Sequence, residues 1–224
     1  MSPFRRAIGG TSSSTRNTRP SRSSTIRGQP LTNPDDFSWV GDHEGIGAFW
    51  RGFGTLWLAA ALLQPDQQRR NADAPYAAAR HWAVEVQFDK GLAGAPNDAI
   101  AASRDTATNP AVLSAFGLAL IGSFGPPAYH ALAGYAPDLA EERGGAAIVA
   151  NAMGELRKVA PGPSAYVSES NFFQADWQRA YWGANYERLR AIKARYDPEG
   201  LFFVHHGVGS EGWSEDGFEW KGAD

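Results

Sequence analysis

The last quarter of the chain most constrains what this sequence can fold into, because it carries a clear order of secondary-structure signals. Residues 164–168 predict a short strand, and residues 174–196 predict a long amphipathic helix. The run Asp197-Pro-Glu-Gly is a helix stop signal, and residues 201–205 predict a final strand. A strand, a long helix and a second strand are therefore expected in this region.

The helix expected at residues 174–196 carries an aromatic stripe, and the usual role of such a stripe is to pack against a core. Asn171 and Gln174 are spaced like a capping box at its start. Asn185 places an amide on the packed face, where it costs a few kcal/mol unless it is hydrogen-bonded. Gly183 costs about 1 kcal/mol relative to alanine, so we expect a close approach to the backbone there. A polar anchor beside a close approach is what a bound planar ligand requires. The stripe consists of Trp177, Tyr181, Asn185, Leu189, Ile192 and Tyr196.

The rest of the chain alternates between helix and strand signals. Helices are expected at residues 42–64, 96–107 and 138–159, and strands at residues 81–88 and 116–124. Such alternation is typical of a parallel α/β sheet. The strand at 81–88, however, alternates cleanly between apolar and polar residues, which favours a sheet open to solvent or ligand on one side. We therefore predict an α+β fold with a mostly antiparallel sheet and helices packed on one face.

The N-terminal residues have a different composition from the rest of the chain. Residues 1–27 hold six arginines and no acidic residue, and they are rich in serine and threonine. A segment with so little to bury cannot offset its ordering entropy, so we expect a disordered tail at residues 1–36 and a folded domain at residues 37–224. The composition also matches a transit peptide, but the apolar stripe of a presequence is absent, and a stray leader or a wrongly chosen start is the plainer explanation.

Charge and composition exclude several classes of function. Beyond residue 27 the chain has 15 basic against 24 acidic residues, which gives no case for nucleic-acid binding. The longest apolar run, residues 53–63, is far shorter than the roughly 20 residues of a membrane span. The absence of cysteine excludes disulfides and thiolate metal sites. It also fits a reducing compartment, and we expect a cytoplasmic protein.

Several short runs match part of a known functional motif but lack the sequence context that the motif requires. Residues 207–212 match G-x-G-x-x-G, but no helix signal follows, so a turn-rich tail is expected. His43-Glu44 lacks the second histidine of a zinc protease helix, and His205 and His206 on a strand would point to opposite faces. We predict no metal site. Ser168-Glu169-Ser170 lacks the flanking glycines of a nucleophile elbow, which leaves a hydrolase as a distant alternative.

One set of motifs, read in order, resembles the C-terminal part of the berberine-bridge-enzyme-like flavin oxidases of the vanillyl-alcohol-oxidase superfamily. It covers about residues 165–206, while residues 37–163 are compatible in pattern with the substrate-binding domain of that family. The matching runs are Tyr166-Val-Ser-Glu, Trp177, Tyr181-Trp-Gly-Ala-Asn-Tyr-Glu-Arg-Leu, Lys193-Ala-Arg-Tyr-Asp-Pro and Phe202.

The resemblance implies roles for five residues. Tyr166 stands where the family has a flavin-contacting tyrosine, and Ser168 replaces a flavin-contacting asparagine. Glu169 replaces the catalytic tyrosine, so a carboxylate would act there as general base toward a substrate hydroxyl or amine. Asn185 matches an asparagine that lies near the isoalloxazine ring. His206 stands where the family has glutamine. On a strand, Glu169 would face away from Tyr166 and Ser168.

The resemblance implies FAD as cofactor, a small organic substrate, and hydride transfer from that substrate to flavin in an oxidase or dehydrogenase. It also implies an FAD-binding domain, for which this chain has no room. We therefore expect a fragment, a split gene product or a truncated gene model that does not hold FAD alone. The alternative is an inactive orphan domain that serves as a binding or interaction module through an exposed apolar sheet face.

Overall fold

The structure is a computed structural model that describes residues 25–26, 29–30, 49–88, 92, 94–126, 128, 133–160 and 162–222. The chain divides into two compact units, Met1–Ala48 and Phe49–Asp224. In the first unit, the described residues form two short antiparallel strands, β1 (Thr25–Ile26) and β2 (Gln29–Pro30). The rest of the tail expected at residues 1–36 lies outside the described residues, so the disordered tail stays a prediction.

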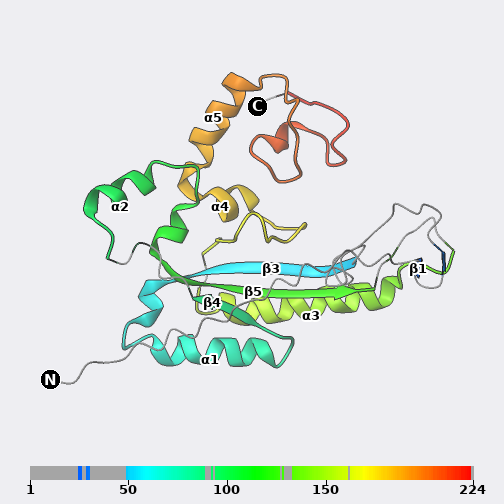
Figure 1. Ribbon diagram of the computed structural model, residues 1–224, viewed down its shortest axis with the longest axis horizontal. Coiled ribbons are helices and arrows are strands. Elements are labelled where there is room, and N and C mark those ends of the chain that lie inside the picture. Colours follow the sequence, from blue (N-terminus) through cyan, green and yellow to red (C-terminus); the bar gives the residue numbers. More distant parts are fainter. Residues whose placement is uncertain are drawn as a thin grey trace. The chain divides into compact units, whose positions relative to one another are not determined.

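The second unit is built on a three-stranded antiparallel sheet, which confirms the predicted α+β fold (Figure 1). The strands are β3 (Phe49–Ala59), β4 (Glu85–Phe88) and β5 (Ala115–Gly125), in the order β3-β5-β4. The sequence predicted β5 almost to the residue. It predicted β4 as the second half of a longer strand, because Trp82 precedes the ladder and instead donates its indole N–H to the Gly122 carbonyl at 2.8 Å.

The helix predicted at residues 42–64 is wrong over its described part. Residues 49–59 are the outer strand β3, and a short 3₁₀ helix, η2 (Ala60–Leu63), follows it. The strand packs against α3 on one face and meets the segment from Tyr166 to Glu169 on the other, so apolar residues occur at many successive positions and also satisfy a helical period. Gly52 and Gly54 fit the strand: a Cβ at Gly54 would lie 3.0 Å from the Cγ of Met153, so the strand can approach its covering helix closely.

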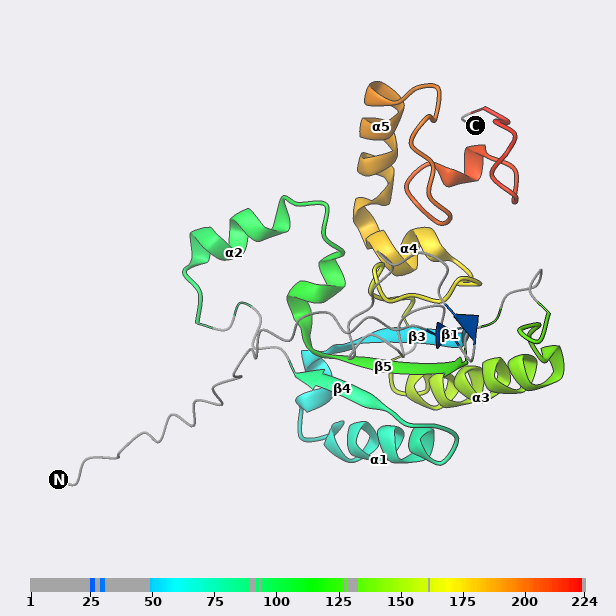
Figure 2. The same cartoon turned by 45° about the vertical axis from the view of Figure 1, so that its right-hand side comes forward.

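Two helices, α1 (Gln68–Ala79) and α3 (Leu139–Arg157), cover one face of the sheet (Figures 1 and 2). The sequence predicted α3, whose N-cap Asp138 accepts hydrogen bonds from the amides of Ala140 and Glu141. It missed α1, an alanine-rich helix with Pro75 inside it. The core between sheet and helices contains Leu56, Leu58, Leu62, Ala74, Ala78, Ala119, Ile121, Val149, Ala152, Met153 and Leu156.

The predicted terminal helix is broken into two. The helix α4 (Trp177–Trp182) ends at Gly183, a 3₁₀ turn η4 (Gly183–Asn185) follows, and α5 (Tyr186–Tyr196) continues the chain. Gly183 has φ 55° and ψ −137°, a backbone conformation that residues other than glycine avoid. The capping box is also wrong, because Asn171 caps a turn at Phe173 and the N-cap of α4 is Asp176.

Residues 164–168 and 201–205 are not strands, contrary to the prediction. Hydrogen bonds to side chains, together with a backbone bond from the Ala165 amide to the Ala180 carbonyl, take the place of a strand ladder. The hydroxyl of Thr55 serves the first segment, and the carboxylate of Asp197 accepts from the amides of Leu201 and Phe202 in the second. The residue patterns that predicted strands at 164–168 and 201–205 therefore occur in segments that pair with no other strand among the described residues.

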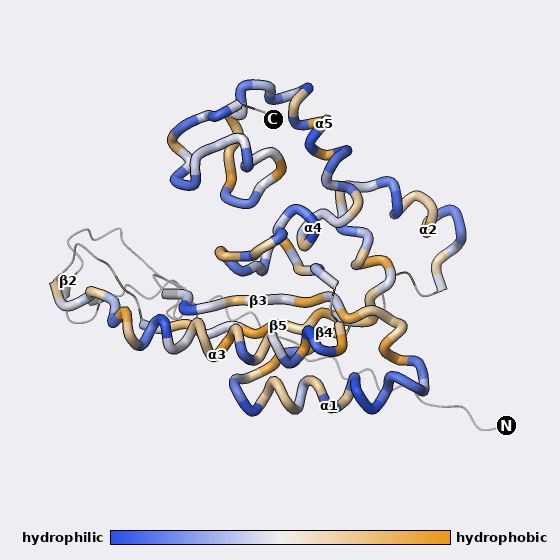
Figure 3. The backbone as a smooth tube through the Cα atoms, turned by 180° about the vertical axis from the view of Figure 1, so that it is seen from behind, coloured by the Kyte–Doolittle hydropathy of each residue, from blue (hydrophilic) through white to orange (hydrophobic). Residues whose placement is uncertain are grey.

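The remaining described helices are α2 (Asn97–Arg104), which the sequence predicted, and the 3₁₀ helices η3 (Pro110–Ser114) and η5 (Ser210–Gly212). Hydrophobic residues concentrate in β5 and alternate with hydrophilic ones along α3 (Figure 3). Among the described residues, no helix combines the length and hydrophobicity needed to cross a membrane.

Candidate functional site

The segment from Tyr166 to Glu169 is tied to the sheet by one buried hydroxyl. Thr55 on β3 is 2% exposed. Its Oγ1 donates to the carbonyl oxygen of Glu169 at 2.8 Å and accepts from the amide of Tyr166 at 2.9 Å. Because Gly54 faces α3, the neighbouring Thr55 points to the opposite face of the sheet. The candidate site residues Tyr166, Ser168 and Glu169 are therefore held on the sheet face that α1 and α3 leave free.

A first cavity, of about 710 Å³, lies along β3 between α3 and this segment. Ser168 and Glu169 line it from the segment, and Met153 and Arg157 line it from α3. Phe172 and Phe173 close one side. Glu169, the predicted base, is half-buried there with its backbone carbonyl held by Thr55, so this residue borders a volume in the size range of small-molecule sites.

A second cavity, of about 500 Å³, lies on the free face of the sheet. Its floor is one row of side chains across the three strands, because Trp57 and Gln87 both pair with Leu118. Tyr166 stands at its wall, with its ring 5.9 Å from that of Trp57 in an edge-to-face arrangement. The structure thus places Tyr166 and Glu169, which lie three positions apart in one segment, at two different cavities. The other lining residues are Ala107, Thr108, Asn109, Val112, Ala165, Val167, Tyr181 and Trp182.

Asn185 lines neither of these two cavities. Its Nδ2 donates to the carbonyl oxygens of Thr106 at 3.1 Å and Thr108 at 2.8 Å. The close approach expected at Gly183 is real, but the approaching group is Asn109, whose Oδ1 would lie 2.9 Å from a Cβ at Gly183. Contacts within the chain therefore account for the Asn185 amide and for the close approach at Gly183, without a bound planar ligand.

His206 is enclosed in a stack of rings. Its imidazole lies 5.3 Å from the ring of Trp177 and 3.8 Å from that of His205, which in turn stacks on Phe172 at 4.1 Å. The expectation that the two histidines point to opposite faces is wrong, because they lie on a turn and His206 has φ 58°. Burial, and then the neighbouring His205, lower the pKa of His206 and favour its neutral form. The described residues contain no group of three or more histidine, aspartate or glutamate side chains placed to bind a metal.

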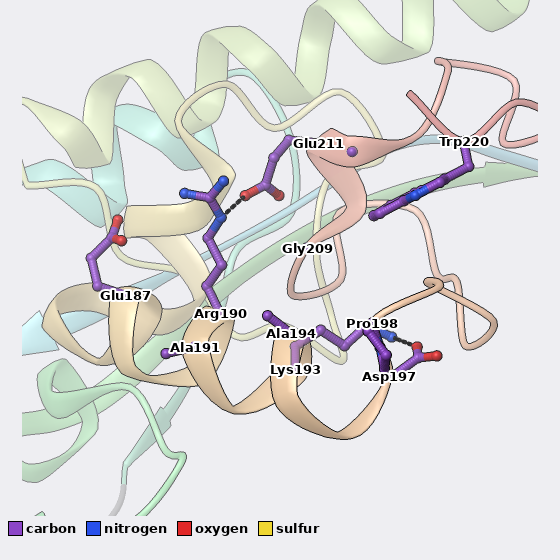
Figure 4. Close-up of a pocket in the computed structure, with 11 residues that line it drawn as sticks. Glu187, Arg190, Ala191, Lys193, Ala194, Asp197, Pro198, Gly209, Glu211 and Trp220 are labelled. Carbon is purple, nitrogen blue, oxygen red and sulfur yellow. Dashed lines mark hydrogen bonds and ion pairs between the residues drawn. The ribbon is translucent and has the colours of Figure 1, made fainter. Parts of the chain in front are cut away.

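A third cavity, of about 470 Å³, lies between α5 and the C-terminal loop, and no motif in the sequence indicated it (Figure 4). Arg190 points toward Glu211, with 3.4 Å between Nε and Oε1, and Lys193 is paired with Asp197. Glu211 also accepts a hydrogen bond from the hydroxyl of Tyr186, and burial together with this bond raises the pKa of Tyr186. The polar walls of this cavity are thus largely engaged with one another.

The pairing of Asp197 predicts a loss of stability in acid. The hydrogen bond from Lys193, with those from two amides, holds the pKa of Asp197 below its ordinary value of 3.8. Its contribution is present above that value and is lost as pH falls through the lowered pKa. We expect Asp197→Asn to lower the urea midpoint at pH 7, and we expect the difference from the original chain to shrink below about pH 4. Asp66→Asn, an exposed carboxylate outside this network, should leave the midpoint unchanged, and a constant difference across pH would contradict the assignment.

Comparison with known proteins gives a partial but consistent match. The family model described as berberine and berberine like matches residues 165–209. The FAD-linked oxidoreductase notD of Aspergillus sp. (strain MF297-2) is 51% identical over 61 residues, which are 27% of this chain and 10% of that protein. The VAO-type flavoprotein oxidase VAO615 of Thermothelomyces thermophilus is 46% identical over 56 residues, which are 25% of this chain and 10% of that protein.

The fold is matched over a longer stretch than the sequence. The crystal structure of the VAO-type flavoprotein MtVAO615 from Myceliophthora thermophila C1 superposes with a TM-score of 0.54 at 23% identity, covering 72% of this chain and 28% of that one. The chain therefore spans a small part of the length of the proteins that it matches. The sequence comparisons agree with the family resemblance of the terminal segment: residues 165–209 match the family described as berberine and berberine like, and the matched relatives include an FAD-linked oxidoreductase and a VAO-type flavoprotein oxidase, while the structural match supports the fold.

Proposed function

We propose that this chain supplies the substrate-side part of an FAD-dependent oxidoreductase, an oxidase or dehydrogenase that moves hydride from a small organic substrate to flavin. The observation that carries the proposal is the position of residues 166–169. They begin the segment that matches the berberine-like family, and Thr55 fixes them on the free face of the sheet beside two cavities.

The described residues fit part of an FAD site. Tyr166 is 38% exposed and Ser168 is exposed, so both are available to contact a flavin ring. Asn185 and His206 fit less well, because the Asn185 amide is bonded to two carbonyls and the His206 ring is stacked on both of its neighbours. Residues 207–212 form a turn and a three-residue 3₁₀ helix, with no helix N-terminus to hold a pyrophosphate. An FAD-binding polypeptide, in the same longer protein or as a separate chain, is therefore part of the proposal.

In this proposal Glu169 is the general base. When bound, flavin supplies the acceptor for the hydride. The Glu169 carboxylate takes the proton from a substrate hydroxyl or amine held in the 710 Å³ cavity, and the Thr55 bond to its carbonyl oxygen limits its movement. Tyr166 and Ser168 position the flavin ring at the sheet.

A second role, as an interaction module, is favoured by one observation. Phe172 and Phe173 are 63% and 83% exposed and pack edge-to-face on each other beside the candidate site. Two large exposed aromatic side chains at one place are typical of a surface that another polypeptide covers. Under the proposed function that polypeptide is the one that binds FAD.

The test uses this chain together with the FAD-binding polypeptide of a curated relative, co-expressed and purified by gel filtration. We expect a flavin absorption band to co-elute with the complex and to be absent when this chain is purified alone with added FAD. Without a co-eluting band in the complex the proposed function fails. A stably folded, flavin-free chain that still binds another partner would favour the interaction module.

Glu169→Gln tests the base in the same complex. With a benzylic alcohol and an aldose offered as hydride donors, we expect flavin reduction to slow by about 10²–10⁴-fold while flavin binding is unchanged, because only proton removal is lost. Glu199→Gln, an exposed carboxylate that lines neither the 710 Å³ nor the 500 Å³ cavity, is the matched control. Reduction at the original rate in Glu169→Gln would remove Glu169 from the mechanism.

A further inference from the structure

Four aromatic rings form one continuous stack beside the 710 Å³ cavity. The ring centroid of Phe172 lies 4.1 Å from that of His205, with an angle of 11° between the two planes. The centroid of His205 lies 3.8 Å from that of His206, which in turn lies 5.3 Å from that of Trp177. Phe172 also lines the cavity, so a contact that holds this ring holds part of the cavity wall.

His205 holds Phe172 in two ways. Besides the ring contact, its Nε2 lies 2.9 Å from the carbonyl oxygen of Phe172. A carbonyl oxygen only accepts, so Nε2 carries a proton and donates it. The neighbouring Phe173 adds an edge-to-face contact at 5.1 Å, and both phenylalanine side chains remain largely exposed. The position of Phe172 therefore depends on where the backbone places His205.

The two histidines are presented by a strained turn. The amide of Gly207 donates to the carbonyl of Val204 at 2.8 Å, so His205 and His206 are the two central residues of a β-turn. His206, the second of them, has φ 58°, a conformation that glycine or asparagine normally supplies. Strain of this kind persists only where surrounding contacts hold it, and it concentrates at ligand-binding and switch regions. Here the ring of His206 is enclosed between His205 and Trp177, so the stack holds the turn in place.

The surroundings of His206 disfavour a positive charge. Trp177 and Tyr181 face it from α4, and the hydroxyl of Tyr181 is bonded to a backbone carbonyl. His205 lies against its other side. Burial, and then His205, lower the pKa of His206, so the enclosed ring favours its neutral form.

The charged groups on the elements around the stack do not offset these two effects. Asp176 lies 3.6 Å from Arg179 on α4, and Glu211 lies 3.4 Å from Arg190, so these groups are engaged with one another. A positive charge on the enclosed imidazole is therefore better accommodated in solvent. The charged or titratable groups on these elements include Glu169, Asp176, Arg179, Tyr186, Arg190 and Glu211.

We propose that the turn at residues 204–207 is a proton-operated clamp on Phe172. While His206 is neutral, the stack keeps the turn in place, and His205 is the positioning residue that holds the ring of Phe172 at the cavity wall. When His206 takes up a proton, its ring leaves the stack for solvent, the turn moves with it, and His205 releases Phe172. The cavity then opens on that side. The clamp goes beyond the proposed function, because it concerns how the cavity opens and does not depend on which ligand the cavity holds.

The direction of the pH dependence follows from the lowered pKa of His206. An imidazole released into solvent has its ordinary pKa of 6.5, which is higher than that of the enclosed ring. The released form therefore binds more protons than the clamped form as the pH falls below this value. We expect release to be rare above it, and to increase about tenfold per pH unit below it until the pH passes the lowered pKa.

The experiment follows Phe172 in the full chain, with 4-fluorophenylalanine incorporated at position 172. Its ¹⁹F resonance and the imidazole resonances of His206 are recorded from about pH 8 to about pH 5, the range in which histidine titrates. We expect the ¹⁹F resonance to move from a stacked to a solvent-exposed position with the same midpoint as His206. The amides of Leu118 and Ala119, buried in β5, should keep their positions because the core does not take part.

His206→Asn removes the titrating group and keeps a residue that tolerates a positive φ. We expect the ¹⁹F resonance to stay at its stacked position throughout, because His205 still contacts Phe172. His205→Ala removes that contact and should give the solvent-exposed position even at about pH 8. His81→Asn is the matched control, because His81 lies beside Glu155 outside the stack, and it should leave the response unchanged.

The inference is overturned if the ¹⁹F resonance does not move in the original chain, or if the response survives in His206→Asn. It is also overturned if the β5 amides move with the same midpoint, because the whole domain then unfolds and no local release occurs. The titration of the original chain needs no further substitution, so it is decisive even where a histidine variant does not fold. Flavin co-elution and flavin reduction test the proposed function separately, so either idea can fail while the other holds.

Discussion

Leu56→Ala should lower the free energy of unfolding by about 2–5 kcal/mol, the cost of deleting a fully buried leucine side chain and leaving a cavity. Leu56 is 1% exposed, lies opposite Ala119 in the sheet, and belongs to the core beneath α1 and α3. The measurement is urea unfolding of the full chain. The substitution should move the midpoint with little change in slope, because the amount of surface exposed on unfolding stays similar.

The matched control for this prediction is Leu63→Ala. Leu63 ends the 3₁₀ helix after β3 and is 47% exposed, so we expect its replacement to change the free energy of unfolding by less than about 1 kcal/mol. The pair separates two descriptions of this region. In the helix predicted from the sequence both leucines lie on one buried face, whereas the strand buries Leu56 and the turn exposes Leu63. Equal losses at the two positions would contradict the strand.

Thr55→Val should destabilise the chain and also release the segment that carries Tyr166 and Glu169. Valine keeps the shape of threonine and removes the hydroxyl, which leaves the Tyr166 amide and the Glu169 carbonyl without their partner at a buried position. Each unsatisfied buried group costs about 1–3 kcal/mol. We expect a lower urea midpoint and, by amide hydrogen exchange, faster exchange of the Tyr166 amide than of amides in β5.

Thr55→Ser retains a hydroxyl and should restore slow exchange at Tyr166. Ser114→Ala removes an exposed hydroxyl that bonds only to the carbonyl of Ala111, and it should leave both measurements unchanged. If the Tyr166 amide exchanges at its original rate in Thr55→Val, this hydroxyl does not hold the segment.

The elements that the sequence predicted correctly depend on local signals. Asp138 caps α3, and the apolar run at 116–124 predicted β5 because a buried central strand is apolar at successive positions. The helix predicted over β3 failed for the same reason, since a strand with apolar residues at many successive positions also satisfies a helical period. Gly183 carried a real signal, but its consequence was a break between α4 and α5 where a continuous helix had been expected.

The sequence could predict only those parts of the candidate site whose residues are close together in the chain. Tyr166, Ser168 and Glu169 lie together because the chain joins them. The row formed by Trp57, Leu118 and Gln87 depends on the pairing register of three strands, which no local pattern encodes. The two predicted strands beside the terminal helix failed because hydrogen bonds to the side chains of Thr55 and Asp197 take the place of a strand ladder.

The break at Gly183 has a consequence for chimaeras built from segments of this chain and of a related protein. Both halves of the broken helix are fastened to one short loop, Asn109 to the Ala180 carbonyl and Asn185 to the carbonyls of Thr106 and Thr108. That loop, at residues 106–110, lies outside residues 165–209, which match the family, and well before them in the sequence. A chimaera that imports residues 165–209 alone would contain the break between α4 and α5 but not the loop at residues 106–110 that hydrogen-bonds to it. We therefore expect a stable chimaera to need residues 106–110 of this chain as well as the terminal segment.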